Sequence, residues 1–490
     1  MLFNSYTYIF LFLPVAVGGY FLAARQWGTK VSNIWLIAVS FFFYGYWNIA
    51  FLPLLMGSIL GNYALARGIM RFKARPRGLL TGKFCFILGM CLDIGMLCYY
   101  KYMDFFIRNL NRVLGTDWEL WHVILPLGIS FFTITQMVYL VGMYFYGDGK
   151  KYRDFVDYVL FVCFFPHLLA GPILYHKSMM KQFRDDSLHR PQGENLARGL
   201  AIFVIGLFKK VIIADALIGP VAEGFAHAGE IGFWEGWCLA FLFMFQMYFD
   251  FSGYTDMAVG AARLMNITIP INFSEPFRAK NLSDMWGRWH MSLTSTITAY
   301  IYTPLMMHMK KITVARSVAV LILTMVIIGA WHGAGWTYII FGAMQGVALG
   351  VNQVWKRSPR TPELPDWLSR SLTLAFMAAS CVMFRAGSVW EALDVYRGML
   401  GWRGLEWPFH FHEAAQATWL DGIPVDGAVL HGLPLLTLML AVFLVSCCHD
   451  SNETVKRMEP NTKWALLLAL MFVFSVLHFT QVTAFLYFQF

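Results

Sequence analysis

The residues best suited to chemistry lie in IGAWHGAGWT, 328–337, which follows an almost wholly aliphatic run. This stretch places an imidazole, His332, beside two indole side chains, Trp331 and Trp336. Imidazole is the side chain whose ordinary pKa lies closest to neutral, so it can accept a proton from a hydroxyl and return it to a leaving group. Because ionisable groups are costly inside a membrane, we interpret His332 as a candidate general base.

The spacing within this stretch predicts how the side chains are arranged. His332 and Trp336 are four residues apart, which would place them on one face of a helix. Gly329, Gly333 and Gly335 remove side chains from the other faces and let another helix, or a ligand, approach the backbone. We therefore expect the imidazole to face a space lined by indole and backbone rather than lipid.

A second histidine, His290, lies about forty residues upstream in WGRWHMSL, 286–293. Trp286 and His290 are four residues apart and would share a helical face. Asp284 and Arg288 have the same spacing in the favourable acid-first order, which predicts a structural ion pair. A lone buried histidine is more often a satisfied core residue than a catalyst, so both interpretations of His290 stay open.

The sequence before His290 predicts an extended segment followed by a helix. Pro270 and Pro276 keep 267–279 extended, because the residue before a proline is displaced from the helical region. Asn281 or Ser283 can then cap the helix by accepting hydrogen bonds from its first N–H groups.

A third polar cluster is QMYFDFSGYTDMAVG, 246–260, within a run otherwise made of apolar residues. Its polar members are Gln246, Asp250, Ser252, Tyr254, Thr255 and Asp256. Ser252 and Asp256 share a helical face while Asp250 points elsewhere, and Gly253 could allow a break that exposes backbone groups to a water-filled cavity. A structural hydrogen-bond network and direct substrate contact are both compatible with this pattern.

The sequence indicates neither a metal nor a prosthetic group. Zinc chemistry would need a third ligand or an H-E-x-x-H motif, and a haem carrier would need axial histidines with free ring nitrogens. The eight cysteines lie almost entirely in apolar segments, and none forms a C-x-x-C motif. We interpret them as small buried apolar residues.

The composition predicts a membrane protein made of helices. Of 490 residues 58% are hydrophobic and 14% charged, whereas soluble domains carry roughly a quarter charged residues. Eleven to thirteen apolar segments approach the roughly 20 residues that a membrane helix needs. They include 5–24, 32–50, 51–66, 84–100, 123–146, 155–175, 199–219, 232–250, 316–331, 336–353, 371–384, 429–447 and 464–486. We therefore expect an all-α polytopic membrane protein whose first segment is retained rather than cleaved.

The net charge of +9 reflects membrane topology rather than nucleic-acid binding. Basic residues gather in short loops at 25–31, 67–83 and 150–153 and alternate with less basic loops, which is the positive-inside pattern. A nucleic-acid site would need aromatic or base-reading partners on an exposed surface, and none is evident. This places the N-terminus outside, the acidic loop 402–428 outside and Phe490 outside.

The chain shows no internal repeat and no soluble terminal domain. Its longest polar stretches, at 177–198, 266–288, 356–370 and 402–428, are too short to fold alone. We therefore predict one membrane domain, 1–490, in which 177–198 could form an amphipathic helix in the interface.

Several stretches together resemble the membrane-bound O-acyltransferase (MBOAT) superfamily, and its alginate O-acetyltransferase-like bacterial polysaccharide branch in particular. Besides GAWHGAGW, these are LFLPVAVGGY, ILPLGISFFT, FFPHLLAGPIL, LFKKVIIAD, YFDFSGYTDMAVG and WGRWHMSL. The resemblance covers 1–353, whereas 354–490 matches only as hydrophobic helix.

The resemblance implies a ring of tilted helices around a thin central wall, where a cytoplasmic tunnel meets an outer funnel. It also implies that His332 is the catalytic histidine and His290 the second one. The remaining polar and aromatic residues near them would contact substrate: Trp331, Trp336, Asp250, Ser252, Tyr254, Asp256, Gln246, Arg288 and Trp286. An acetyl group would pass from cytoplasmic acetyl-CoA, across the bacterial inner membrane, to an exported polysaccharide or a periplasmic relay protein, with no cofactor.

One departure leaves the acceptor open. Alginate-type members carry Gly-Gly-Asn-Arg soon after the segment that here reads AYIYTPL, where this chain has MMHMKKITVAR, 306–316. Alginate, cellulose or another polysaccharide is therefore equally compatible. A transporter or flippase would also bury aspartates and histidines, but such folds show repeated halves with paired broken helices, and the two polar motifs here each occur once.

Overall fold

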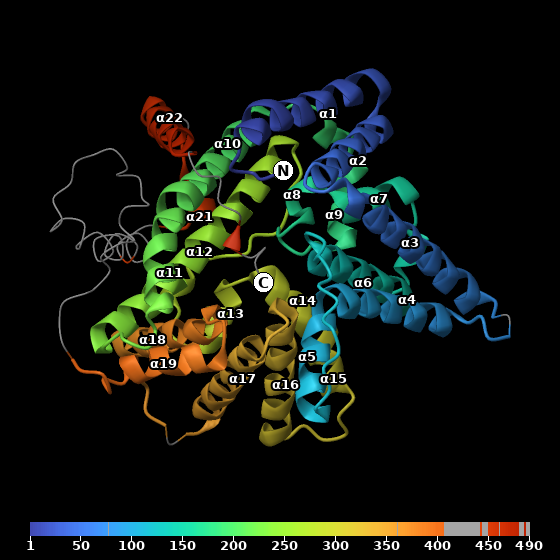
Figure 1. Ribbon diagram of the computed structural model, residues 1–490. Helices are drawn as coiled ribbons and strands as arrows, with labels where there is room; N and C mark the ends of the chain where they lie inside the picture. Colours follow the sequence, from blue (N-terminus) through green and yellow to red (C-terminus); the bar gives the residue numbers. More distant parts are fainter. Residues whose placement is uncertain are drawn as a thin grey trace. The chain divides into compact units, whose positions relative to one another are not determined.

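The computed structural model describes residues 1–76, 78–359, 361–405, 442, 449–459, 461–479 and 485–486, to which all structural statements refer. The secondary-structure elements of these residues are helices, as Figure 1 shows. The prediction of an all-α protein is therefore confirmed. The expected span 429–447 and the loop 402–428 beyond residue 405 lie outside the described residues, apart from residue 442.

The tertiary contacts divide the chain into two compact units. The first comprises Met1–Phe203 and Thr255–Pro270, and the second comprises Val204–Tyr254 and Ile271–Phe490. Helices α10 (Gly193–Phe208) and α12 (Phe233–Leu264) contribute residues to both units. The expectation of a single domain over 1–490 stays a prediction.

The first unit is a set of packed helices. They are α1 (Leu13–Trp27), α2 (Thr29–Gly45), α3 (Leu52–Ala74), α4 (Gly82–Leu97), α5 (Met103–Leu114), α6 (Ile129–Phe145), α7 (Phe155–Cys163), α8 (Phe165–Leu168) and α9 (His176–Phe183). Short π- or 3₁₀-turns lie at Tyr8–Phe12, Ile49–Phe51, Cys98–Tyr102, Asp148–Lys150 and Asp186–His189. Helix α1 packs on α2, and α3 packs on both α4 and α6. Asp154 caps α7 by accepting from the Val156 and Asp157 N–H groups, the role expected of an aspartate before a helix.

The second unit holds the candidate histidines. Its helices are α11 (Ile218–Ala226), α13 (Leu282–Arg288), α14 (Met291–Ile297), α15 (Thr303–Met307), α16 (Val314–His332), α17 (Trp336–Arg357), α18 (Asp366–Arg385), α19 (Val389–Met399), α21 (Ser451–Arg457) and α22 (Thr462–Leu477). Turns of π- or 3₁₀-helix lie at Lys209–Ala214, Asp215–Leu217, Pro276–Arg278 and Thr298–Tyr302. Helix α17 packs along α16 and also against α18.

Several described helices are long and apolar enough to cross a membrane. They are Tyr8–Trp27, Ile49–Ala74, Gly82–Leu114, Val314–His332 and Asp366–Arg385, and two shorter apolar helices are Ile129–Phe145 and Thr462–Leu477. A polytopic membrane protein is thereby confirmed. The total of eleven to thirteen spans, the thin wall, the tunnel and the funnel stay predictions.

Two stretches fold differently from what the sequence suggests. The expected span 155–175 is divided into α7 and α8, because Pro166 cannot donate to the preceding turn and its ring would clash with a carbonyl there. The expected amphipathic helix 177–198 is also wrong. Its residues form all of α9 except His176, then a 3₁₀-turn and the start of α10, since Arg190 is extended ahead of Pro191.

Helices α16 and α17 form a tight antiparallel hairpin because glycines line their contact. A side chain at Gly329 would overlap the Tyr338 carbonyl oxygen, and one at Gly342 would overlap the Met325 carbonyl oxygen. A Cβ at Gly346 would lie 2.7 Å from the Ile322 Cα atom. Small residues at this spacing let the backbones of two helices approach closely. The approach expected at Gly329 is therefore made by another helix.

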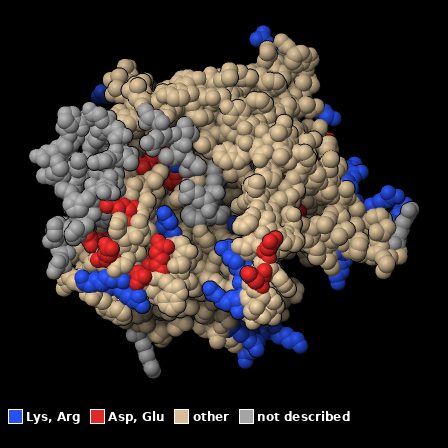
Figure 2. Space-filling view, in the orientation of Figure 1, with Lys and Arg blue, Asp and Glu red and all other residues tan. Residues whose placement is uncertain are grey.

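The hairpin has a basic end and a histidine end. Lys310 and Lys311 in the connection before α16, and Arg316 in the first turn of α16, are exposed. Figure 2 shows Lys and Arg at the lower edge, where Figure 1 places the end of α15 and the start of α16. The 19 residues of Val314–His332 rise about 27 Å. His332 therefore lies almost a full membrane thickness away from this basic connection.

Candidate active site

His332 is the last residue of α16 and is buried, with 6% of its surface exposed. Its ring packs edge-on against the indole of Trp331, with centroids 5.1 Å apart, and against Phe384 of α18 at 5.3 Å. Helix α16 ends here because Gly333 adopts an extended conformation, with φ −161° and ψ 155°. The imidazole is thus held at a helix terminus between two aromatic rings.

The expected pairing of His332 with Trp336 on one helical face is wrong. The chain is not helical over Gly333–Gly335, and Trp336 begins α17 with 51% of its surface exposed. The glycine positions are nevertheless explained, because the ring of Tyr338 occupies the space where a Gly333 side chain would project. The space beside the backbone is filled by a second helix rather than left open for a ligand at these positions.

His290 is buried between α13 and α14 in a left-handed backbone conformation, with φ 45° and ψ 50°. Its ring lies 4.7 Å from the Phe251 ring and 6.4 Å from the Trp331 indole, measured between centroids. Since Trp331 also contacts His332, one indole has both histidines as neighbours. The structure therefore brings together the two histidines that sequence reasoning selected.

Trp286 does not share a helical face with His290, which corrects the expectation from spacing. Helix α13 ends at Arg288, two residues before His290, so the four-residue spacing crosses a helix end. The buried Trp286 indole donates to Gln345 Oε1 at 3.2 Å, and Gln345 in turn donates to Ser380 Oγ at 2.7 Å. Trp286 thus joins α13 to α17 and α18.

An irregular segment brackets His290 by hydrogen bonds on both sides. Before the histidine, the Ser274 N–H donates to the Arg288 carbonyl at 3.0 Å. After it, the Met291 N–H donates to the Asn272 carbonyl at 3.0 Å, and Ser292 Oγ donates to Asn272 Oδ1 at 2.6 Å. These bonds fix the backbone around a residue whose left-handed conformation is unfavourable for a side chain.

Two local predictions in this region are confirmed. Asn281 caps α13 by accepting from the Asp284 N–H at 3.1 Å. Arg288 Nε donates to Asp284 Oδ1 at 2.7 Å, which is the predicted ion pair one helical turn apart. Arg288 therefore stabilises α13, and any substrate contact by it stays a prediction.

Asp250 and Lys210 are buried and form an ion triad with the partly exposed Asp215. Lys210 Nζ is 2.6 Å from Asp250 Oδ1 and 2.6 Å from Asp215 Oδ1, and Asp250 Oδ2 accepts from the Leu486 N–H at 3.0 Å. Lys210 and Asp215 meet because the π-turn Lys209–Ala214 brings residues five apart onto one face. These contacts favour the structural interpretation of Asp250. Sequence reasoning missed Lys210, although LFKKVIIAD puts a lysine and an aspartate in an otherwise apolar run.

The break expected at Gly253 is absent, because α12 runs without interruption from Phe233 to Leu264. A Cβ at Gly253 would lie 2.7 Å from the Gly206 carbonyl oxygen, so this glycine lets α12 approach α10. It serves close packing of two helices and does not open the backbone to a cavity.

The remaining polar candidates of α12 are buried. The ring of Tyr254 stacks on Phe485 with centroids 4.6 Å apart, whereas Gln246 and Ser252 lie within the same helix and are also buried. Asp256, likewise buried, belongs to the part of α12 assigned to the first unit. Direct substrate contact by any of these residues stays a prediction.

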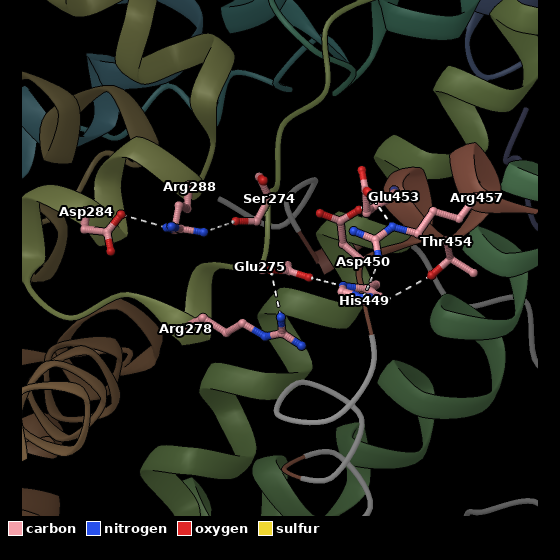
Figure 3. Close-up of polar contacts among 10 residues, drawn as sticks. All are labelled: Ser274, Glu275, Arg278, Asp284, Arg288, His449, Asp450, Glu453, Thr454 and Arg457. Atoms are coloured by element: carbon pink, nitrogen blue, oxygen red, sulfur yellow. Dashed lines mark hydrogen bonds and ion pairs between the residues drawn. The ribbon is translucent and has the colours of Figure 1, made fainter. Parts of the chain in front are cut away.

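A further polar cluster, which no motif marks, joins the segment before His290 to residues late in the chain (Figure 3). Glu275 binds His449 and Arg278 through different carboxylate oxygens, at 2.7 and 3.1 Å. His449 also contacts Arg457, which is paired with Glu453 and lowers the pKa of that carboxyl below its usual range. Sequence reasoning missed this cluster, since its members are up to 182 residues apart and form no motif.

The described residues contain no group of three or more His, Cys, Asp or Glu placed to hold a metal ion. What the site offers is two imidazoles around an indole, enclosed by Phe251 and Phe384. Such a site can exchange protons with a bound hydroxyl or thiol in surroundings poor in water.

Comparison with known proteins adds the chemistry of relatives. Residues 146–389 match the model of the membrane-bound O-acyltransferase family, a range that includes both histidines. The chain is 36% identical to a peptidoglycan O-acetyltransferase of Helicobacter pylori, over 100% of this chain and 98% of that protein. It is 34% identical to a probable alginate O-acetylase of Pseudomonas aeruginosa over 91% of this chain and 81% of that protein. A teichoic acid D-alanyltransferase of Streptococcus thermophilus is 28% identical over 48% of this chain and 58% of that protein.

Proposed function

Because the chain belongs to the membrane-bound O-acyltransferase family and is an acyltransferase of the bacterial inner membrane, we propose that it transfers acetyl groups from cytoplasmic acetyl-CoA to an exported polymer. Membership of an acyltransferase family argues against the alternative of a transporter or flippase. In this proposal His332 is the general base, and His290, which also neighbours Trp331, orients the reacting groups.

The observation that carries the proposal is the pair of buried histidines on one indole. Trp331 lies 5.1 Å from the His332 ring and 6.4 Å from the His290 ring, between centroids. The histidines come from different elements, a helix end and an irregular segment, so their proximity is a property of the fold. A buried, aromatic setting keeps water away from a thioester that would otherwise be hydrolysed.

The reaction that this geometry supports is acyl transfer to a hydroxyl. The His332 imidazole would remove the proton of the acceptor hydroxyl while its oxygen attacks the thioester carbonyl. The carbon–sulfur bond would then break, and the imidazolium would return the proton to the departing thiolate. General-base assistance of this kind contributes about 10²–10⁴-fold to a rate.

The position of His332 supports transfer across the membrane. We infer from its lysines that the connection before α16 is cytoplasmic, by the positive-inside rule, and His332 lies about 27 Å along the helix from that end. The donor would therefore enter from the basic side and meet the acceptor near the outer side. The acceptor would be peptidoglycan or another exported polysaccharide, reached directly or through a periplasmic relay protein, since relatives are named for peptidoglycan and alginate.

Sealed membrane vesicles of defined orientation test this proposal. Acetyl-CoA labelled in its acetyl group should label a polysaccharide acceptor only when donor and acceptor face opposite sides of the membrane. Each candidate acceptor, peptidoglycan fragments or alginate, is supplied separately. Transfer that requires both substrates on the same side would contradict the proposal. In a parallel reaction a labelled D-alanyl thioester replaces acetyl-CoA, and transfer of D-alanine in place of acetyl would also contradict it.

A further inference from the structure

The segment 449–457 lies outside the range that matches the family model, yet it is bonded to the segment that holds His290. His449 Nδ1 is 2.7 Å from Glu275 Oε1, as Figure 3 shows. Glu275 directly follows Ser274, whose N–H group is bonded to the Arg288 carbonyl just before His290. A late part of the chain therefore contacts the support of a candidate catalytic histidine.

The contacts of His449 define which ring nitrogen carries its hydrogen. Arg457 Nη1 lies 3.1 Å from His449 Nε2, and a guanidinium can only donate. Nε2 is thus the acceptor, so Nδ1 carries the hydrogen and donates to Glu275. Arg457 is itself held by Glu453, with Nε 2.6 Å from Oε1.

The backbone turns a corner at Glu275, and the side-chain contacts of Glu275 hold this corner in place. Its backbone is left-handed, with φ 48° and ψ 53°, a conformation disfavoured for residues with a Cβ. His449 binds one carboxylate oxygen, and Arg278 binds the other at 3.1 Å. The corner directs Ser274 and Asn272 toward the backbone on either side of His290.

Residues 485 and 486 make a second contact, with the part of α12 that packs against His290. The Leu486 N–H donates to Asp250 Oδ2 at 3.0 Å, and Phe485 lies 5.7 Å from the Phe251 ring. Phe251 packs edge-on against His290, with centroids 4.7 Å apart. This contact is independent of the first, since it involves neither Glu275 nor His449.

We propose that the segments 449–457 and 485–486 position His290 for acyl transfer, His449 acting through Glu275 and Phe485 acting through Phe251. The proposal rests on the proposed function, because it needs His290 in the reaction. His449 and Phe485 are positioning residues that touch no substrate. Loosening either one lowers the turnover number more than the affinity for donor, because small displacements of reacting groups reduce rate steeply.

Three substitutions at one position separate the hydrogen bond from the bulk of the ring. Asn at 449 places an N–H donor where Nδ1 lies, Gln extends its amide to the position of Nε2, and Ala removes both. We expect His449→Asn to keep at least half of the parent kcat with acetyl-CoA. We expect His449→Ala and His449→Gln to lose about tenfold or more in kcat, with KM for acetyl-CoA changed less than about threefold.

Lys456→Gln is the matched control, since Lys456 lies on the same helix α21 and its side chain is exposed to solvent. It should keep the parent kcat. An equal loss in Lys456→Gln and His449→Ala would overturn the proposal, because the effect would then come from α21 as a whole. An unchanged kcat in His449→Ala, or an Asn variant as slow as Ala, would also overturn it.

Hydrogen exchange separates this proposal from the proposed function. His449→Ala should exchange faster than the parent over 272–292, whatever reaction the protein catalyses. Unchanged exchange there overturns the positioning role. If His449→Ala exchanges faster over 272–292 but the parent protein transfers no acetyl group, the proposed function is overturned and the contact with His449 is not.

Discussion

The two candidate histidines are held by regions of opposite kinds. His332 ends α16, the first helix of a hairpin. The two helices of this hairpin pack through glycines that lie near each other in the sequence, so the position of His332 depends on backbone packing. His290 lies in an irregular segment fixed by side-chain hydrogen bonds, including one to His449. Substitutions that disturb the hairpin prevent its two helices from packing and so reduce folding. Substitutions in the segment around His290 can make it more mobile while the protein stays folded. Substitutions in the two regions should therefore affect different observables.

The largest effect on folding is expected in the hairpin. Gly342→Val would force a side chain into the Met325 carbonyl, so we expect a loss of about 3 kcal/mol in the free energy of unfolding and little folded protein. Thermal unfolding in detergent measures the effect. Gly61→Ala is the control, since nothing lies within 4 Å of its added Cβ, and it should be neutral or slightly stabilising. Equal stability of the two variants would refute the packing role of the glycines.

An intermediate effect is expected beside His290. Asn272→Ala removes the acceptor of the Ser292 N–H and hydroxyl, which should cost about 1–2 kcal/mol of stability. Because these bonds flank His290, kcat per folded molecule should fall as well, in contrast with any folded hairpin variant. Activity normalised to monodisperse protein measures this. A parent-like kcat would mean that the segment does not position His290.

The smallest effect is expected on α13. Asp284→Asn weakens its ion pair with Arg288 but keeps an oxygen near the Lys280 N–H. Partly exposed pairs one turn apart contribute about 0.2–0.5 kcal/mol, so Tm should change by a degree or two at most. A large loss of activity at unchanged Tm would instead indicate that Arg288 contacts substrate, as the sequence also allowed.

The sequence predicts what depends on neighbours in the chain. The Asn281 cap, the Asp284–Arg288 pair and the close approach at Gly329 follow from local spacing, and the structure contains all of them. The same reasoning failed where a helix stops inside the spacing it assumed. His332 and Trp336 are separated by an extended glycine segment, and Trp286 and His290 by the end of α13.

Other features depend on contacts that local spacing does not reveal. Glu275 and His449 are 174 residues apart, and nothing around either residue marks the other as its partner. Asp250 looked like a candidate for substrate contact because its counterion, Lys210, lies on a different element. Long-range polar pairs therefore decide which buried charges are structural, and only the fold identifies them.

The general-base role of His332 is tested most directly by His332→Gln. Glutamine retains size and some hydrogen bonding but cannot take up a proton at neutral pH, so abundance in the membrane and acetyl-CoA binding should stay near parent values. Acetyl transfer to the exported polymer should fall about 10²–10⁴-fold. The measurement is the acetyl content of the polymer beside a membrane blot, and a variant that acetylates at more than about a tenth of the parent rate would contradict the account.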